Sequence, residues 1–508
     1  MDSLYNAISP SFRLASILRL LNRIKDTEMG TGWELTKQLR EQIYKYANYQ
    51  QTSVSLRQMV QFGPNPSPGS IFLASQFIVE ELPIRLALKV KDLENAPLGL
   101  SNAPSTIKVK NWYAQSFEEL TSLPKPSIDE NLSKLLYSKN EETSSNEQVN
   151  PAVNELNNVA LNNAFSDDGI VVRLHHHSYF NTKQDNYEQH VDSPTFGKKY
   201  FTPCPINIIW PKEVYDYNKL VYDTLSKIKK RHDATVATMA QGVQEWKVEN
   251  KTVRVNSSVQ TFLDRFYMSR IGIRMLIGQH IALNMSQASP TKSRINNFLN
   301  GSKNVSNSLS NSKNNYVGVI CTQCNVGEIA EDAIETAKYI CEEYYGLFES
   351  PKIQLIAPHN PISFIATIEF HTPRLKKQFI EESNNPNLKP DDVDLNDLNF
   401  PPIKVIISEG VEDIAIKISD EGGGIPRSEV PLIWTYLYTT VDETPVLEPE
   451  YDQSSFKAPM AGFGYGLPIS RLYAQYFGGD LKLISMEGYG TDVYLHLNRL
   501  SSSSEPLP

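Results

Sequence analysis

The sequence predicts an α+β protein, with an N-terminal four-helix bundle domain followed by a C-terminal α/β-sandwich domain. In the first half of the chain, apolar residues recur at helical spacing over long stretches. Beyond residue 400, short stretches alternate between apolar and polar residues, as strands do, and lie around two glycine clusters. The 508 residues, 40% of them hydrophobic, contain enough apolar material for two separate cores.

Long helices are expected in the first half at 71–93, 214–246 and 259–283. Phe262 and Phe266 lie on one face of the last stretch. Pro83 is expected to bend or break the first stretch, because proline lacks the amide donor that a helix interior requires. A four-helix bundle is the economical way to pack such helices.

Polar stretches interrupt this pattern at 138–168, 296–315 and 383–399, where Asn, Ser and acidic residues are frequent. Such compositions contribute little to a core and are expected to be loops or insertions. The expected limits are 51–308 for the helical domain, with an insertion around 138–210, then 317–500 for the second domain and 501–508 for a tail.

The first 50 residues leave two interpretations open. Residues 11–25 carry four basic side chains among leucines and isoleucines, and no acidic residue occurs there before Asp26. This is typical of a mitochondrial targeting segment. An ordinary first helix fits the same spacing, and Asp2 counts mildly against import.

The first glycine cluster follows a predicted strand. Residues 414–419 alternate between isoleucine and Ala, Lys or Ser, so Asp420 is expected at the carboxyl edge of a sheet. A carboxylate there is suited to accept a hydrogen bond from an adenine amino group. Gly422 and Gly424 are expected to supply positive φ angles and bare backbone against which a nucleotide can lie.

The second cluster places Gly462, Gly464 and Gly466 before an amphipathic stretch at 467–477. Backbone amides at such a helix N-terminus are suited to bind a polyphosphate. A single Gly-x-Gly is most often a plain turn, but Asp-x-Gly-x-Gly followed by Gly-x-Gly-x-Gly-Leu indicates an ATP site. The Gly-Lys-Ser/Thr of a Walker loop is missing, as is the βαβ unit of a dinucleotide fingerprint.

Further elements are expected around these clusters: a helix at about 428–438, a mobile lid at 441–460, and antiparallel strands at 480–486 and 491–497. This order resembles the ATP-binding fold that gyrase, heat-shock chaperones, histidine kinases and mismatch-repair ATPases share. The resemblance implies an ATPase domain of the gyrase/histidine-kinase type at the C-terminal end.

Several segments resemble the mitochondrial pyruvate dehydrogenase kinases. The helical half contains Glu-Leu-Pro-Ile-Arg-Leu-Ala at 81–87, Trp-Tyr-Ala-Gln-Ser-Phe at 112–117 and Phe-Leu-Asp-Arg-Phe-Tyr-Met-Ser-Arg at 262–270. The block at 462–476 is especially close, and the resemblance covers most of the chain from about 52 to 497. The branched-chain ketoacid dehydrogenase kinases share this architecture and are the nearest alternative.

The resemblance implies ATP and Mg²⁺ as cofactors, with transfer of the γ-phosphate to a serine of the decarboxylase component of the pyruvate dehydrogenase complex. Glu369 would orient or deprotonate that serine hydroxyl. The implied nucleotide contacts are Asp420, Gly422, Gly424, Thr439, Thr440, Gly462, Phe463, Gly464, Tyr465, Gly466 and Leu467.

One departure from the family concerns magnesium. The family's magnesium-binding helix carries a Glu followed four positions later by an Asn, whereas Glu369 is followed at that distance by Pro373. Proline has no side-chain oxygen for a cation that prefers oxygen ligands. Three interpretations stay open: a kinase using another ligand, such as Asn384 or Asn385; an inactive regulator that still binds nucleotide; or a gene-model error across 358–402. The metal ligands are left unassigned.

Composition narrows the remaining function classes. The net charge of -9 argues against non-specific nucleic-acid binding, and no apolar run approaches the roughly 18 to 20 residues of a membrane span. Cys321 and Cys324 have no second pair to complete a zinc site. His232 and His280 raise the alternative of a histidine kinase, although a packed bundle histidine is the more frequent case, and the histidines at 175–177 are expected in a solvated loop.

The resemblance also implies a mitochondrial matrix location, docking to the lipoyl-bearing core component, and a homodimer or a heterodimer with a paralogue. Three function classes therefore compete: a protein serine kinase acting on pyruvate dehydrogenase, a nucleotide-binding pseudokinase that partners an active paralogue, and a histidine kinase. An acid-stable phosphoserine product distinguishes the first from the third.

Overall fold

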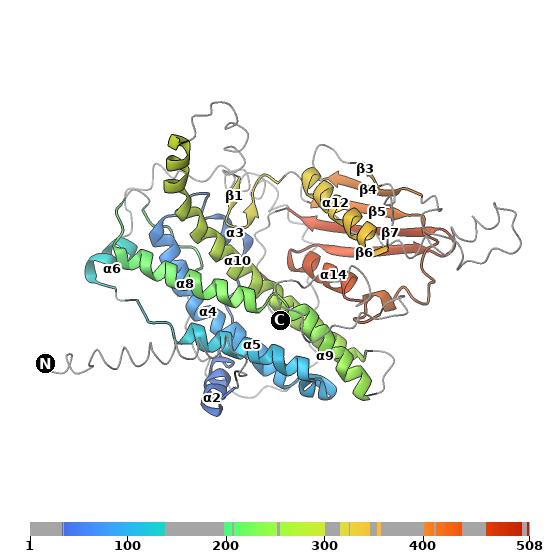
Figure 1. Cartoon of the computed structure of the whole chain (residues 1–508), viewed down its shortest axis with the longest axis horizontal. Coiled ribbons are helices and arrows are strands. Elements are labelled where there is room, and N and C mark those ends of the chain that lie inside the picture. Colours follow the sequence, from blue (N-terminus) through green and yellow to red (C-terminus); the bar gives the residue numbers. More distant parts are fainter. Residues whose placement is uncertain are drawn as a thin grey trace, which may run out of the picture.

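The computed structural model describes part of the chain as two groups of elements, a set of long helices and a sheet with helices packed on it (Figure 1). The described residues are 33, 35–126, 128–137, 198–205, 208–250, 255–299, 315–324, 326–345, 353–356, 401–410, 413–438, 464–499 and 505–506. The expected targeting segment, the histidines at 175–177, most of the expected loops and the expected lid lie outside these residues.

The helical part is built around α4, which packs against α2, α5, α8 and α10, while α9 packs on α5. The prediction of an α+β chain with a helical N-terminal part is confirmed. The bounds of the helices are α2 (Lys37–Tyr46), α3 (Leu56–Val60), α4 (Pro68–Glu94), the 3₁₀ helix η1 (Pro97–Asn102), α5 (Pro104–Thr121), α6 (Glu130–Tyr137), α8 (Lys212–Arg231), α9 (Thr235–Asn250) and α10 (Ser257–Leu299).

The expected weakness at Pro83 is not a break: α4 continues through it. Leu82, Pro83 and Ile84 are all buried, as are most residues of the helix between Phe77 and Leu93. Burial of apolar side chains on several sides stabilises this helix by more than the hydrogen bond that proline removes.

The single stretch expected at 214–246 is wrong, because the chain forms two helices there. The first, α8, ends at Arg231, and His232 is its C-cap residue. Thr235 begins α9 and its hydroxyl donates to the carbonyl oxygen of His232 at 2.8 Å. The break redirects the chain from the surface of α4 and α10 to that of α5, and a count of apolar positions does not reveal it.

Among the described residues, the C-terminal sheet has five strands in the order β3-β4-β5-β7-β6. β3 and β4 are parallel, and all other neighbours are antiparallel. Helices α12 and α14 pack on the sheet, where their apolar residues join those of the strands in one core (Figure 1). The bounds are β3 (Ile353–Ile356), β4 (Ile403–Glu409), β5 (Asp413–Asp420), β6 (Asp480–Met486), β7 (Gly490–Asn498), α12 (Val326–Tyr345) and α14 (Gly466–Tyr476); a separate hairpin is formed by β1 (Tyr316–Val317) and β2 (Ile320–Cys321).

The strands expected at 480–486 and 491–497 and the helix expected at 467–477 are confirmed by β6, β7 and α14. The helix expected at about 428–438 is wrong: the chain makes turns there and one short 3₁₀ helix, η5 (Leu432–Trp434). Pro431 offers no amide donor in the middle of that run, and Leu437 has a positive φ of 61° that no α-helix contains.

The two parts share a buried contact, because α14 lies against α10. Tyr436, Tyr465 and Tyr476 of the C-terminal part belong to the same apolar cluster as the bundle residues. Across the described residues, no helix combines the length and apolarity that crossing a bilayer requires.

Candidate nucleotide site

Asp420 is the last residue of β5, so it lies at the carboxyl end of this central strand, as the sequence predicts. Its Oδ1 accepts two backbone hydrogen bonds, from the amide of Gly422 at 2.8 Å and from the amide of Thr491 at 3.3 Å. These two bonds orient the half-buried carboxylate. Its other oxygen receives no hydrogen bond from any described residue, so Oδ2 is available as an acceptor for a ligand's amino group.

The turn after Asp420 uses glycine conformations, though not quite as expected. Gly423 and Gly424 have φ angles of 91° and 70°, whereas Gly422 is not among the positive-φ glycines. Gly422 instead serves through its amide, which bonds the carboxylate of Asp420. The prediction of a positive φ was therefore right for Gly424 and wrong for Gly422, because the turn reverses one residue later.

This first glycine turn packs against the tip of the β6–β7 hairpin. The amide of Gly423 donates to the carbonyl oxygen of Tyr489 at 3.0 Å, and the amide of Gly488 donates to that of Gly423 at 2.7 Å. A Cβ added to Gly424 would lie 2.1 Å from the carbonyl oxygen of Met486. The hairpin therefore fixes the turn, and only a residue without a side chain fits this close approach.

Ser485 and Thr491 also support the turn that follows Asp420, and neither of them was predicted from the sequence. The Ser485 hydroxyl accepts the amide of Ile425 at 2.6 Å and lies 2.9 Å from the hydroxyl of Thr491. Thr491 is buried and faces Asp420 across the β5–β7 pair. Polar residues within alternating strands look solvent-facing from their pattern alone, so nothing in the sequence distinguished them.

The second glycine cluster leads directly into α14, as expected. Gly464 has a φ of 63°, and a Cβ added to it would lie 2.3 Å from the carbonyl oxygen of Tyr438. Gly466 is the first residue of the helix, and a Cβ built on it meets no atom within 4 Å. Gly466 is therefore exposed at the start of α14, and the backbone amides of a helix N-terminus are suited to an anion.

Other predicted site residues lie outside the described residues: Glu369, Pro373, Thr439, Thr440, Gly462 and Phe463. Tyr438 and Gly464, which border two of these groups, contact each other. Leu467, in the first turn of α14, packs at the edge of the sheet core. The described residues thus bring the second glycine cluster next to the chain that precedes Thr439.

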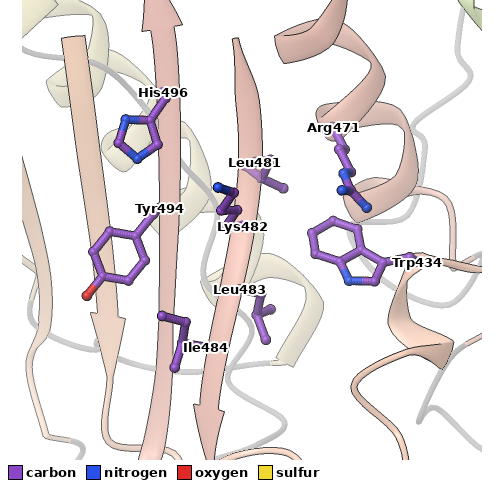
Figure 2. A pocket seen from close by; sticks show the side chains of 8 residues that line it. All are labelled: Trp434, Arg471, Leu481, Lys482, Leu483, Ile484, Tyr494 and His496. Carbon is purple, nitrogen blue, oxygen red and sulfur yellow. The ribbon is translucent and has the colours of Figure 1, made fainter. Parts of the chain in front are cut away.

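A pocket of about 380 Å³ lies at β6 (Figure 2). Its lining includes Trp434 and Arg471 on one side of β6 and Tyr494 and His496 on the other, as Figure 2 shows. Neither Asp420 nor a glycine of either cluster lines it. The pocket therefore does not coincide with the nucleotide site proposed from the two glycine segments.

Metal ligands were left unassigned by the sequence, and the described residues add no candidates. In this part of the chain, no three His, Cys, Asp or Glu side chains converge as a metal site would require. Cys321 and Cys324 are free thiols. Asp420 already uses one oxygen for backbone amides, so it is arranged for a hydrogen-bonding ligand.

His232 and His280 are both packed inside the bundle, as the commoner case predicts. Each has its Nε2 3.0 Å from a serine hydroxyl, that of Ser116 for His232 and that of Ser75 for His280. Burial lowers the pKa of each imidazole to about 3. A phosphoacceptor histidine must reach a nucleotide, and these two rings are shielded from solvent, which disfavours the histidine-kinase alternative.

Comparisons with known proteins agree with this architecture. Residues 395–501 match the family described as histidine kinase-, DNA gyrase B-, and HSP90-like ATPase. Residues 53–321, more than half of the chain, match the family described as mitochondrial branched-chain alpha-ketoacid dehydrogenase kinase. The chain belongs to the mitochondrial α-ketoacid dehydrogenase kinase family.

Relatives within this kinase family align over nearly the whole chain. The mitochondrial [pyruvate dehydrogenase (acetyl-transferring)] kinase of Schizosaccharomyces pombe is 40% identical over 474 residues, which are 93% of this chain and 99% of that protein. The kinase of the same name from Arabidopsis thaliana is 34% identical and covers 93% of this chain and 97% of its own. Human isozyme 3 is 31% identical, with coverage of 94% and 90%. The resemblance read from the sequence is confirmed, and the kinase and ATPase assignments imply use of ATP.

Proposed function

We propose that this chain is a protein serine kinase that transfers the γ-phosphate of ATP to the decarboxylase component of the pyruvate dehydrogenase complex and thereby inactivates it. The observation that carries the proposal is the arrangement of the Asp420 carboxylate. Two backbone amides hold its Oδ1, and its Oδ2 is available to accept a hydrogen bond from a ligand. The names of the relatives supply the substrate class.

Nucleotide binding follows from the two glycine segments. Oδ2 of Asp420 would accept from the adenine amino group, while the backbone of Gly422 and Gly424 lies against the base or sugar. The amides of Gly464, Tyr465 and Gly466 would face the phosphates at the start of α14. Further nucleotide contacts are proposed for Leu467 and, from the family resemblance, for Thr439, Thr440, Gly462 and Phe463.

Phosphoryl transfer requires a group that orients the attacking serine. Glu369 is proposed for this role, in which it would hold or remove the proton of the hydroxyl. Mg²⁺ would neutralise charge on the transferred phosphoryl group. Among the described residues, no three His, Cys, Asp or Glu side chains converge as a metal site would require, and Pro373 has no side-chain oxygen in place of the family's Asn.

The phosphate added to the target carries about -1.5 to -2 charges, which would repel anions and obstruct the entrance to its active site. We further propose a mitochondrial matrix location, docking through the lipoyl-bearing core component, and a dimer with itself or a paralogue. The mitochondrial names of the relatives support the location at the level of the organelle.

Two alternatives have a specific observation in their favour. A branched-chain ketoacid dehydrogenase kinase is favoured by the description of the family matched over 53–321. A pseudokinase that binds nucleotide without transferring phosphate is favoured by Pro373 at the position of the expected Asn.

Transfer of labelled phosphate from MgATP to purified pyruvate dehydrogenase complex tests the proposal. We expect acid-stable phosphoserine on the decarboxylase component with the wild-type chain and none with Asp420→Ala. Asp413→Ala is the matched control, because Asp413 begins the same strand at its other end, away from the glycine clusters. It should retain transfer.

Each other result has a definite meaning. ATP binding without transfer would overturn the kinase assignment in favour of the pseudokinase. Transfer to the branched-chain complex alone would establish that alternative. If the wild-type chain bound no ATP, the nucleotide site itself would be wrong.

A further inference from the structure

The chain on either side of the segment 439–463 comes together against the helical bundle. Tyr438 and Gly464 border this segment, and the backbone of Gly464 lies so close to the carbonyl oxygen of Tyr438 that no Cβ fits between them. Next to them, Tyr436 and Tyr465 are buried against Tyr267 of α10. We call Tyr267, Tyr436 and Tyr465 the tyrosine cluster.

The rings of the tyrosine cluster contact one another pairwise. The centroid of Tyr436 lies 5.0 Å from that of Tyr465 and 5.5 Å from that of Tyr267, and Tyr465 meets Tyr267 edge-on at 5.9 Å. Tyr465 immediately precedes α14 and is its N-cap residue. The position of its ring therefore sets how the amides at the start of α14 are presented.

Polar contacts from α10 hold the Tyr436 side of this arrangement. The phenol of Tyr436 donates to Oδ1 of Asp264 at 2.8 Å. Gln260 accepts the backbone amide of Tyr436 at 3.0 Å and donates from its own amide to the carbonyl oxygen of Trp434 at 3.0 Å. Gln260 and Asp264 are one helical turn apart, so they lie on the same face of α10. Together they bond the carbonyl oxygen of Trp434, the backbone amide of Tyr436 and the hydroxyl of Tyr436.

Two local features are unfavourable by themselves and are stabilised by these contacts: the backbone conformation of Leu437 and the burial of the Asp264 carboxyl. Leu437 has a φ of 61°, a conformation that is unfavourable for a residue with a side chain and persists only where its surroundings impose it. Burial raises the pKa of the Asp264 carboxyl, and the Tyr436 hydrogen bond opposes that rise. On the far side, Trp434 lies against the guanidinium of Arg471, 4.8 Å from its ring centroid, which ties the same turn to α14 (Figure 2).

We propose that Asp264 and Gln260, on α10 of the helical domain, are positioning residues for the nucleotide site. They hold Tyr436, and through the tyrosine cluster they hold Tyr465 and the amides of residues 464–466 in the orientation that binds the phosphates of ATP. The proposal rests on the proposed nucleotide site and adds that the helical domain sets its affinity for ATP. A site whose groups are already ordered loses less conformational freedom on binding.

Direct measurement of the ATP dissociation constant, with the free energy of unfolding measured in parallel, tests this role. Tyr436→Phe removes one hydroxyl and keeps the ring, so the expected result is ATP binding weaker by about fivefold or more, the range of coupling between distinct sites. Tyr44→Phe is the matched control, since Tyr44 also donates to a carboxylate, that of Glu94 at 2.7 Å, but on α2 at another part of the bundle. Its ATP affinity should equal that of the wild type.

Two further variants separate positioning from folding. Asp264→Ala should weaken ATP binding as Tyr436→Phe does, and the double variant should be no weaker than either single one, because both remove the same contact. Asp264→Asn keeps an acceptor oxygen and should bind ATP more tightly than Asp264→Ala. If Tyr436→Phe does not fold, this comparison is the test, and equal ATP affinity of the two Asp264 variants would overturn the proposal. The KM for ATP should rise in the affected variants while the KM for the protein substrate stays unchanged.

The proposal is overturned if Tyr436→Phe and Asp264→Ala bind ATP within twofold of the wild type while losing as much stability as Tyr44→Phe, because the contact would then be structural only. Since binding is measured without phosphate transfer, a wild-type chain that binds ATP but transfers nothing would refute the proposed kinase activity and leave this test intact.

Discussion

At the scale of single residues, environment decides what a side chain can do. Asp420 and His232 are both ionisable groups that the sequence singled out. The carboxylate lies half-buried at a sheet edge with one oxygen available, whereas the imidazole is stacked on Tyr113 at a centroid distance of 4.5 Å and shielded from solvent. The first is arranged for a ligand and the second for packing.

Acidification should destabilise the fold through the two buried histidines. Their pKa of about 3 in the folded chain lies below the value of about 6.5 expected when unfolded, so the unfolded chain binds more protons in between. Stability is then complete above about pH 6.5 and falls as the pH decreases towards 3. Between pH 7 and pH 5 we expect a loss of about 2 kcal/mol for each histidine.

Urea unfolding at pH 7 and pH 5 measures this effect. His280→Asn should lose less stability on acidification than the wild type, because one of the two protonations is gone. Tyr44→Phe, which removes a hydroxyl and leaves both histidines in place, is the control and should show the pH dependence of the wild type. An equal pH dependence in all three proteins would contradict the assignment of the effect to buried imidazoles.

At the scale of elements, the turn after β5 and the β6–β7 hairpin form one unit. Backbone hydrogen bonds join Gly423 to Tyr489 and Gly488, so the glycine turn has little freedom once the hairpin has formed. Alternation and glycine content predicted both pieces from the sequence, since each is a local property. Their mutual contact depends on the β5–β7 pairing, in which Asp420 faces Thr491.

Alanine at two glycines of this unit should have unequal effects. Gly424→Ala places a side chain on a residue with a φ of 70° and a Cβ 2.1 Å from the carbonyl oxygen of Met486. We expect the free energy of unfolding to fall by about 3 kcal/mol or more and ATP binding to be lost. Gly488 has a similar φ of 84°, but a Cβ added there meets no atom within 4 Å. We expect Gly488→Ala to lower the free energy of unfolding by about 1 kcal/mol and to retain ATP binding. Thermal unfolding and ATP titration of the two variants provide the comparison. Equal losses would show that the close approach to the hairpin is not rigid.

At the scale of the whole molecule, the end of the chain reaches the interior of the bundle. The carboxylate of Glu505 makes a bidentate ion pair with the buried Arg85 of α4, at 2.7 and 2.8 Å. Arg85 also donates to Glu81 at 2.9 Å and to the carbonyl oxygen of Thr52 at 2.7 Å. A buried guanidinium with both carboxylates in place is fully paired, so each partner removed leaves charge or donors unsatisfied.

Glu505→Gln should therefore destabilise the chain by about 1–3 kcal/mol, because Gln cannot accept both guanidinium donors while Glu81 still neutralises Arg85. Glu409→Gln is the matched control: Glu409 pairs with Arg499 at the surface, where an ion pair contributes about 0–1 kcal/mol. The midpoints of chemical unfolding of the two variants measure the difference. A Glu505→Gln variant as stable as Glu409→Gln would show that the tail is not anchored at Arg85.

The sequence by itself determined the properties that depend on neighbours along the chain. Most of the helical and strand periodicity, the positive φ of Gly424 and the kinase-family segments were predicted correctly, because a few adjacent residues specify each of them. The positive φ expected for Gly422 and the single helix expected at 214–246 were wrong. Packing overrode a short-range rule at Pro83, where the buried α4 continues through the proline. At 428–438 the expected helix is replaced by turns and η5, because Pro431 offers no amide donor and Leu437 has a positive φ.

Only the tertiary structure decided which distant residues meet. Asp264 reaches Tyr436, Arg85 reaches Glu505, and Gly424 reaches Met486, although no spacing in the sequence links the members of these pairs. Such contacts arise when whole elements bury their apolar faces together, so they depend on the packing of the complete core. The two glycine segments of the proposed site were therefore predictable from the sequence, whereas the contacts between α10 and the turn at 434–436 were not.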